Sequence, residues 1–275
     1  MNANYHTHCT YCDGKDPLSA YIPVAEKMNF RQLGFSSHAP VPFENNFGIP
    51  EAQIPNYCQD IDHLKGQTNV QLLKALECDF IPGMSTPFRH FKDTYGLDYI
   101  IGGVHLVRPK NSDRLWFIDG HDRDIYDHGL HQLFNGNIQL AVTTFWEQTF
   151  EMLETQQLDI IAHVDKIKMH NQRRFFREDE SWYEALVDEA LRLIRRRGVV
   201  MEVNTRGLYK RRCDAFYPST EILMKAKKLD IPVVVSTDAH KAEELGLLAA
   251  EAEQELRNCG YGNVVHFDKR EGGFR

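Results

Sequence analysis

Short apolar runs alternate with longer amphipathic stretches along most of the chain. Runs rich in Ile and Val predict strands, and apolar residues spaced three and four positions apart predict helices. The expected strands are Asn4–His8, Gln32–Ser37, Val70–Asp79, Asp98–His105, Leu158–His163, Val199–Asn204 and Ile231–Thr237. The expected helices are Leu18–Met28, Pro50–Lys65, Ile138–Thr155, Glu180–Arg197, Ser219–Leu229 and Ala242–Arg257. The third strand is ambiguous, because its sequence VQLLKALECD also suits a helix by composition.

This alternation predicts the fold class. Strands that alternate with helices indicate βαβ units and a parallel sheet. Seven such units favour a closed or nearly closed α/β barrel over an open sheet, and α/β barrels of about this length routinely form one domain. We therefore expect a single TIM-like barrel domain over residues 1–275. The active sites of such barrels lie at the carboxyl ends of the strands.

Metal-ligand side chains stand at the ends of all seven expected strands. In chain order they are His6 and His8, His38, Glu77, His105, His163 with Asp165, Glu202 with Asn204, and Asp238 with His240. Ordinary strand ends finish in Gly, Asn, Asp or Ser, which form turns, and histidine is not among them. Because the ends of barrel strands converge on one rim, these side chains should crowd together. Crowded imidazoles and carboxylates are stable mainly when they bind cations.

The spacing and type of these residues favour a metal site. Side chains alternate along an extended strand, so His6 and His8 project to the same side. Histidine with carboxylate suits Zn²⁺, Mn²⁺ or Fe²⁺ better than Ca²⁺ or Mg²⁺. The competing interpretation is a set of structural histidines with satisfied hydrogen bonds at the starts of loops. Cys9 and Cys12 form a CxxC, but no second CxxC follows at zinc-knuckle spacing, so we expect both in the loop after the first strand.

Composition narrows the class of protein. The chain has 275 residues, 32 Lys and Arg against 39 Asp and Glu, and a formal net charge of −7, which disfavours nucleic-acid binding through bulk positive charge. A small anionic substrate remains compatible, because bound metal ions reverse the local sign. No apolar run approaches the ~20 residues that span a bilayer, and the polar start MNANYHTHCTYCDG is unlike a secretory signal. We expect a cytoplasmic protein whose six cysteines are reduced thiols.

Seven short segments carry a family resemblance, in the order HTHCTYCDG, SSHAP, ALECDFIPG, IIGGVH, IIAHVD, EVNTRGLYK and VVSTDAH. From residue 4 to about residue 245 the chain resembles the polymerase and histidinol phosphatase (PHP) family, and its stand-alone histidinol-phosphate phosphatases in particular. Asp13 stands where some members of the family have His, and Gly103 stands where many have Ser. The resemblance implies a distorted (β/α)7 barrel that holds three divalent metal ions. One ion would be held by His6, His8, Glu77 and Asp238, a second by Glu77, His105 and His163, and a third by Asp13, His38 and His240.

Such a cluster is suited to the hydrolysis of phosphate esters. Two metal ions about 3.5–4 Å apart share a hydroxide, and a bridging carboxylate such as Glu77 holds them at that distance. The ions lower the pKa of water toward 7 and neutralise charge on the phosphate as the hydroxide attacks in line. Glu77 and Asp238 would thus be catalytic through the ions they hold. The leaving alkoxide would take its proton from Asp165 or from a water on the third ion, two alternatives that the sequence does not separate.

Cations on the same rim are expected to contact the substrate. Arg206, two residues past the sixth strand, is the first candidate for a phosphate contact, because its planar fork matches phosphate oxygens. Lys166 and Lys168, after the fifth strand, are second candidates, and each of the three cations has an alternative interpretation as a solvated loop charge. Histidinol carries an ammonium group and an imidazole, so Glu202 and Glu44 are candidates for an acidic wall.

The sequence alone is compatible with three functions. The first is a metal-dependent phosphomonoesterase that acts on L-histidinol phosphate in histidine biosynthesis. The second is the same machinery acting on a nucleotide, an oligonucleotide end or a phosphotyrosine. The third is a metal-binding module without activity, against which the full ligand set argues. The expected partner is a small phosphate ester, since no basic and aromatic stripe indicates a nucleic-acid groove. The oligomeric state is open.

Overall fold

Seven parallel strands form the central sheet of the computed structural model, which describes residues 2–110 and 112–275. Their order is β1-β2-β3-β4-β7-β8-β9. A parallel bridge between Thr7 and Ala239 connects the two edges of the sheet, so the sheet forms a nearly closed barrel, as the alternation predicted. The strands are β1 (Ala3–Asn4), β2 (Gln32–His38), β3 (Gln71–Asp79), β4 (Tyr99–Gly103), β7 (Ile160–Ile161), β8 (Val200–Asn204) and β9 (Val233–Ser236).

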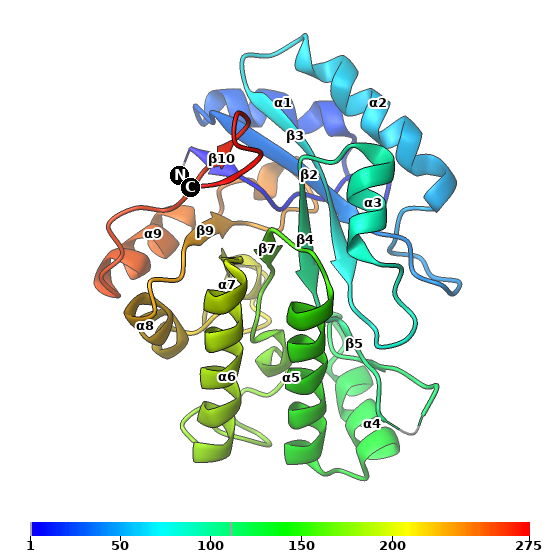
Figure 1. The fold of residues 1–275 in the computed structure, drawn as a ribbon, viewed down its shortest axis with the longest axis vertical. Helices are drawn as coiled ribbons and strands as arrows, with labels where there is room; N and C mark the ends of the chain where they lie inside the picture. Colours follow the sequence, from blue (N-terminus) through cyan, green and yellow to red (C-terminus); the bar gives the residue numbers. More distant parts are fainter. Residues whose placement is uncertain (1, 111) are drawn as a thin grey trace.

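Helices surround the barrel (Figure 1). Of these, α5 illustrates why they form, because it begins after Asn137, whose side chain accepts a hydrogen bond from the backbone N–H of Leu140. It buries Val142, Phe145 and Trp146 along one stripe, at the spacing of an amphipathic helix. The helices are α1 (Leu18–Lys27), α2 (Ile54–Lys65), α3 (Phe88–Tyr95), α4 (Arg123–Phe134), α5 (Ile138–Thr155), α6 (Ser181–Arg197), α7 (Arg206–Tyr209), α8 (Thr220–Lys228) and α9 (Ala249–Asn258), with 3₁₀ turns η1 (Glu51–Gln53), η2 (Lys166–Lys168) and η3 (Ala242–Glu244).

The last expected helix differs from the structure in its first half. The prediction of one helix over Ala242–Arg257 is wrong, because residues 242–244 form η3 and α9 begins only at Ala249. Between them Gly246 and Leu248 have φ angles of 77° and 57°. This left-handed backbone cannot continue a right-handed helix. The chain after β9 is therefore a loop with a short turn, and that loop borders the ligand cluster.

A small hairpin covers the amino-terminal end of the barrel. Its strands are β10 (Phe267–Asp268) and β11 (Gly273–Phe274). The ring of Phe274 lies edge-on to Tyr5 at 5.0 Å and to Tyr99 at 5.5 Å between centroids. Phe267 joins the same buried cluster as the first residues of several strands. At the opposite end of the barrel, where the strands finish, the polar side chains lie. A second hairpin, β5 (Leu106–Val107) with β6 (Trp116–Phe117), follows β4 at that end.

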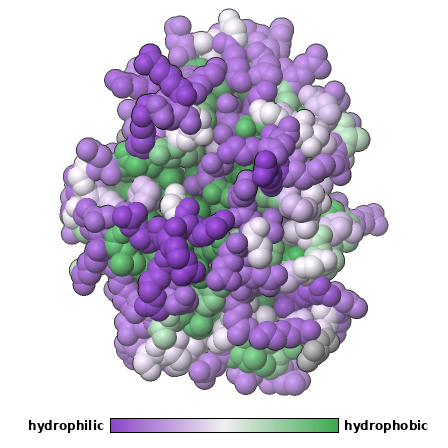
Figure 2. Space-filling model, in the orientation of Figure 1, coloured by the Kyte–Doolittle hydropathy of each residue, from purple (hydrophilic) through white to green (hydrophobic). Residues whose placement is uncertain are grey.

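The surface is predominantly polar on the face shown in Figure 2, where apolar residues form small patches. Large apolar side chains that are exposed, such as Leu140 and Met224, lie on different helices. Scattered exposed apolar residues of this kind are normal on folded proteins. Within the described part of the chain, no helix is long and apolar enough to cross a membrane.

Candidate metal centre

Glu77 is the hub of a buried cluster at the carboxyl ends of the strands. It is 1% exposed and lies opposite His38 in the register between β2 and β3. Its Oε2 atom lies 3.1 Å from Nε2 of His6, 3.3 Å from Nε2 of His8 and 3.1 Å from Nδ1 of His38. Three imidazoles from the first two strand ends therefore face a single oxygen of this carboxylate.

The other oxygen of Glu77 faces two further imidazoles. Its Oε1 atom lies 3.0 Å from Nε2 of His163 and 3.5 Å from Nε2 of His105. The His163 ring lies close to Gly103, where an added Cβ would come within 3.0 Å of its Cε1 atom. The absence of a side chain at Gly103 thus leaves room for this imidazole. A carboxylate placed between two groups of imidazoles has the arrangement of a bridging ligand.

The end of β9 brings Asp238 to the same cluster. Its Oδ1 atom lies 3.4 Å from Nε2 of His8, 3.9 Å from Nε2 of His6 and 3.4 Å from Nδ1 of His240. The backbone of Asp238 has φ 50°, and that of His163 has φ 25°. Non-glycine residues rarely adopt such angles, and they concentrate at functional sites where the surroundings enforce them.

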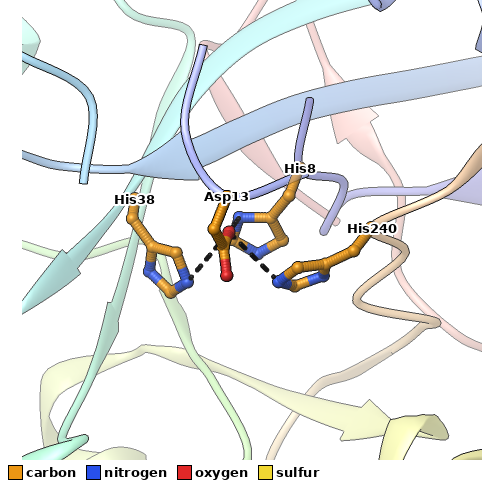
Figure 3. Close-up of side chains that lie close together, drawn as sticks. All are labelled: His8, Asp13, His38 and His240. Atoms are coloured by element: carbon orange, nitrogen blue, oxygen red, sulfur yellow. Dashed lines mark ion pairs between the residues drawn. The ribbon is translucent and has the colours of Figure 1, made fainter. Parts of the chain in front are cut away.

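Asp13 adds a further carboxylate to the same cluster, shown in Figure 3. Its Oδ1 atom lies 3.3 Å from Nε2 of His240, 3.9 Å from Nε2 of His38 and 4.0 Å from Nδ1 of His8. The three rings surround the carboxylate and come from three different segments of the chain (Figure 3). The structure thus brings all nine predicted ligands together, at the rim where the strand ends placed them.

A second layer of side chains orients several of these imidazoles. Glu202 is fully buried, and its Oε1 atom lies 2.7 Å from Nδ1 of His6, on the side of the ring opposite Glu77. Its Oε2 atom accepts a hydrogen bond from the backbone N–H of His163 at 3.0 Å. Sequence reasoning offered Glu202 as part of a substrate wall, but these contacts place it behind the ligands. A carboxylate behind a metal-binding histidine is the usual means of fixing its tautomer and orientation.

Two residues that the sequence analysis did not assign to the site complete this layer. Asp79 accepts a hydrogen bond from the backbone N–H of His105 at 2.9 Å, and its Oδ2 atom lies 3.4 Å from Nδ1 of the same ring. Asp79 is two residues past Glu77 on one strand, so the alternation of side chains could have identified it. Cys12 lies with its Sγ 3.5 Å from Nδ1 of His8, whereas Cys9 contacts Ser37.

The charges of the cluster influence one another strongly in the absence of bound ions. Burial raises the pKa of Glu77, but the surrounding imidazoles lower it well below its usual range. Burial lowers the pKa of His6, whereas the carboxylates of Glu77, Glu202 and Asp238 raise this pKa to about 10. Burial also lowers the pKa of His105, and Asp79 with Glu77 raises it to about 9. Without bound ions, the rings of His6 and His105 therefore hold protons that partly balance the negative charge of the carboxylates.

Unpartnered ligand atoms show that this residue set fits divalent ions. Nε2 of His6, Nε2 of His8 and Oδ1 of Asp13 are buried and have no hydrogen-bond partner among the described residues. Buried polar atoms are rarely left unpaired, and three unpaired ligand atoms within one cluster of imidazoles and carboxylates fit a cation as their partner. Groups with ligand atoms within 4.8 Å of one another are His8, Asp13, His38 and His240, then His6, His8 and Asp238, then His38, Glu77 and His105. Imidazole and carboxylate donors of this kind suit zinc, manganese or iron.

A cavity of about 610 Å³ opens over the cluster. Arg206 lines it with a side chain that is 11% exposed. Glu44 and Phe47 also line it, and the Phe47 ring lies 5.7 Å from the His38 ring. The cavity lining therefore combines candidate metal ligands and a guanidinium with an aromatic ring and a further carboxylate.

The remaining candidates from the sequence are not part of that lining. Asp165 is fully buried, accepts from the backbone N–H of Ser219 at 3.0 Å and lies 2.7 Å from Nζ of Lys168. Lys166 is also buried, with Nζ 3.1 Å from Oδ2 of Asp119. Asp119 does line the cavity, 3.7 Å from Nε2 of His105, but it follows a short strand that no pattern predicted.

The fold and the cluster define a TIM-like barrel with a group of candidate metal ligands at the carboxyl ends of its strands. A family model described as the PHP domain matches residues 4–206. The chain therefore belongs to the PHP domain family. The resemblance seen in the sequence is thereby confirmed.

Relatives of known description match almost the whole chain. A Deinococcus radiodurans protein described as "Probable histidinol-phosphatase" is 27% identical over 273 residues, which cover 96% of each chain. The "Histidinol-phosphatase" of Bacillus subtilis is 26% identical and covers 88% of this chain and 94% of its own. A crystal structure of histidinol phosphate phosphatase from Lactococcus lactis, complexed with zinc, L-histidinol and phosphate, has a TM-score of 0.70 at 16% identity and covers 100% of this chain and 98% of that chain. This structural likeness confirms the barrel fold.

Proposed function

We propose that this chain is a metal-dependent phosphomonoesterase that hydrolyses L-histidinol phosphate to L-histidinol and phosphate, a reaction of histidine biosynthesis, in the cytoplasm. The observation that carries the proposal is the set of residues that line the cavity. The ligand cluster with Arg206 suits a phosphate, whereas Phe47 and Glu44 suit an imidazole and an ammonium group. Relatives described as histidinol-phosphatases, matched over most of their length, support the same substrate.

Three divalent ions, of zinc, manganese or iron, are part of the proposal. The close grouping of ligand atoms in three overlapping sets supports this number. Bound ions would supply a hydroxide nucleophile at neutral pH and would offset the negative charge of the phosphate. The proposed ligand sets are His6, His8, Glu77 and Asp238, then Glu77, His105 and His163, and finally Asp13, His38 and His240.

The chain's own residues bind and orient the substrate. Glu77 and Asp238 hold the ligand cluster in place from two strands that are not neighbours in the sheet. Arg206 binds the phosphoryl group, because its Nη1 atom is fixed at 2.7 Å to the carbonyl oxygen of Asp238, directly beside the cluster. Since Asp165 is enclosed with Lys168 outside the cavity lining, the leaving alkoxide takes its proton from water in the cavity.

The experiment that tests this function is a substrate panel on purified protein reconstituted separately with zinc, manganese and iron. L-Histidinol phosphate should be hydrolysed with a kcat/KM far above that of p-nitrophenyl phosphate, mononucleotides and a phosphotyrosine peptide. L-Histidinol should inhibit as a product, because it occupies the wall that Glu44 helps to form. Faster turnover of a nucleotide or of phosphotyrosine would refute the substrate, and bound metal without any phosphate release would refute the enzymatic function.

A further inference from the structure

The turn after the last barrel strand contains a buried acid that no part of the proposed function uses. Glu244 ends η3, four residues past His240, and is 4% exposed. The side chain of its neighbour Glu243 is 77% exposed and points to Lys241 at the surface. A buried carboxylate is costly unless it is paired and hydrogen-bonded, so the contacts of Glu244 indicate its role.

Both oxygens of Glu244 have partners that belong to the rim of the cavity. The Oε2 atom accepts a hydrogen bond from the backbone N–H of His240 at 2.8 Å and lies 3.4 Å from Nη1 of Arg206. The Oε1 atom forms a close ion pair with Nζ of Lys210. The acid therefore lies between two cations, at the point where the guanidinium meets the loop that carries His240.

Arg206 is held by one of its three nitrogens. Its Nη1 atom donates to the carbonyl oxygen of Asp238 at 2.7 Å and to the hydroxyl of Tyr209 at 3.1 Å, in addition to facing Glu244. In the part of the chain that the structure describes, no hydrogen bond is recorded for Nε or Nη2. An arginine anchored through one nitrogen keeps the rest of its fork for a second anion, and a phosphate is bound best by two parallel N–H groups.

We propose that Glu244 is a positioning residue that fixes the Arg206 guanidinium beside the ligand cluster, so that the fork meets the phosphoryl group of the substrate. This rests on the proposed function for the role of Arg206. Without the charge at Glu244, Arg206 keeps the carbonyl of Asp238 and the hydroxyl of Tyr209, which are neutral acceptors. It then loses its only ion pair within 4 Å among the described residues, while the Asp238 carboxylate still attracts it from farther away, and its long side chain regains rotational freedom.

The test compares Glu244→Gln with Glu243→Gln, a neighbouring acid at the surface. The binding of inorganic phosphate to metal-loaded protein is measured by calorimetry, and hydrolysis of p-nitrophenyl phosphate is measured in parallel. Glu244→Gln should weaken phosphate binding and raise KM by about 10–100-fold, the range of a hydrogen bond to a charged group, with metal content unchanged. Glu243→Gln should match the wild type. Glu244→Asp, which keeps the charge, should recover part of the phosphate affinity.

A double-mutant cycle with Arg206→Ala separates positioning from a general effect on the fold. If Glu244 acts through Arg206, the double variant should lose no more phosphate affinity than Arg206→Ala alone. Losses that add, unchanged phosphate binding in Glu244→Gln, or a loss of metal with normal phosphate affinity in the fully loaded fraction would each overturn the proposal. If the wild type binds phosphate and cleaves p-nitrophenyl phosphate but not L-histidinol phosphate, the substrate assignment fails while this test of Glu244 still applies.

Discussion

The contacts of Glu202 predict that it governs metal affinity rather than substrate affinity. When an ion occupies Nε2 of His6, the remaining ring proton is on Nδ1, which donates to Oε1 of Glu202 at 2.7 Å. The Oε2 atom accepts from the backbone N–H of His163 at 3.0 Å and from Nδ2 of Asn204 at 3.0 Å. Three donors thus converge on two anionic oxygens inside a fully buried site.

Replacing Glu202 by Gln keeps the size of the side chain but leaves one acceptor oxygen for these three donors. At least one buried donor then faces an NH₂ group, and a lost hydrogen bond to a charged group costs about 1.5–3 kcal/mol. If this cost falls on the orientation of His6, metal affinity should decrease by about 10–100-fold, which is the range for partners behind metal ligands. The KM of protein that is saturated with metal should change little.

The assay is metal content after dialysis against buffers of graded free zinc, followed by turnover at saturating metal. Glu44→Gln is the matched control, because Glu44 lines the cavity and, among the residues that the structure describes, forms no hydrogen bond or ion pair with a ligand. That control should keep wild-type metal affinity and raise the KM for L-histidinol phosphate more than the KM for p-nitrophenyl phosphate. A higher KM with unchanged metal affinity in Glu202→Gln would refute the reasoning and restore the acidic wall inferred from the sequence.

Three further predictions concern the same cluster. Glu77→Ala should abolish turnover and remove metal from two of the three sites by mass spectrometry, because its carboxylate lies between two groups of imidazoles; wild-type rates would contradict a shared ligand. Arg206→Ala should raise KM by about tenfold or more with metal content intact, and loss of metal would mean that it supports the cluster instead. Metal loading near pH 7.5 should release protons, because the pKa values of His6 and His105, about 10 and about 9, leave both rings protonated without ions. The number of protons released should decline as the pH rises through 9–10. Calorimetry in buffers of different ionisation enthalpy measures this release, and an unchanged heat across buffers would argue against it.

The strand ends made the site predictable because barrel geometry converts a periodic sequence pattern into proximity. His6, His105 and His163 lie far apart in the sequence, yet each lies two residues past the end of a strand and all face Glu77. Residues outside that rule were not predictable in the same way. Asp119 follows the short strand β6, whose two residues carry no periodicity, and its contact with His105 depends on tertiary packing.

The sequence predictions differ from the structure mainly in the direction of side chains that follow a strand. Asp165 and Lys168 follow β7 as expected, but η2 turns them into a buried ion pair outside the cavity lining. The turn at Gly246 was also hidden, because the composition of AEELGLLAAEAEQELR suits a continuous helix. That residues 1–275 form one domain stays a prediction, which a single cooperative unfolding transition would support.

The place where the two edges of the sheet meet implies a structural role for the proposed ions. The edges of the sheet meet through the bridge of Thr7 with Ala239, and a ligand pair flanks each side of it, His6 with His8 and Asp238 with His240. Ions held by both pairs would clasp segments separated by most of the sequence, much as a disulfide does across a long loop. Depletion of such ions would then loosen the barrel along this line and expose the chain to cellular proteases. The supply of ions would therefore determine the abundance of the protein as well as its specific activity.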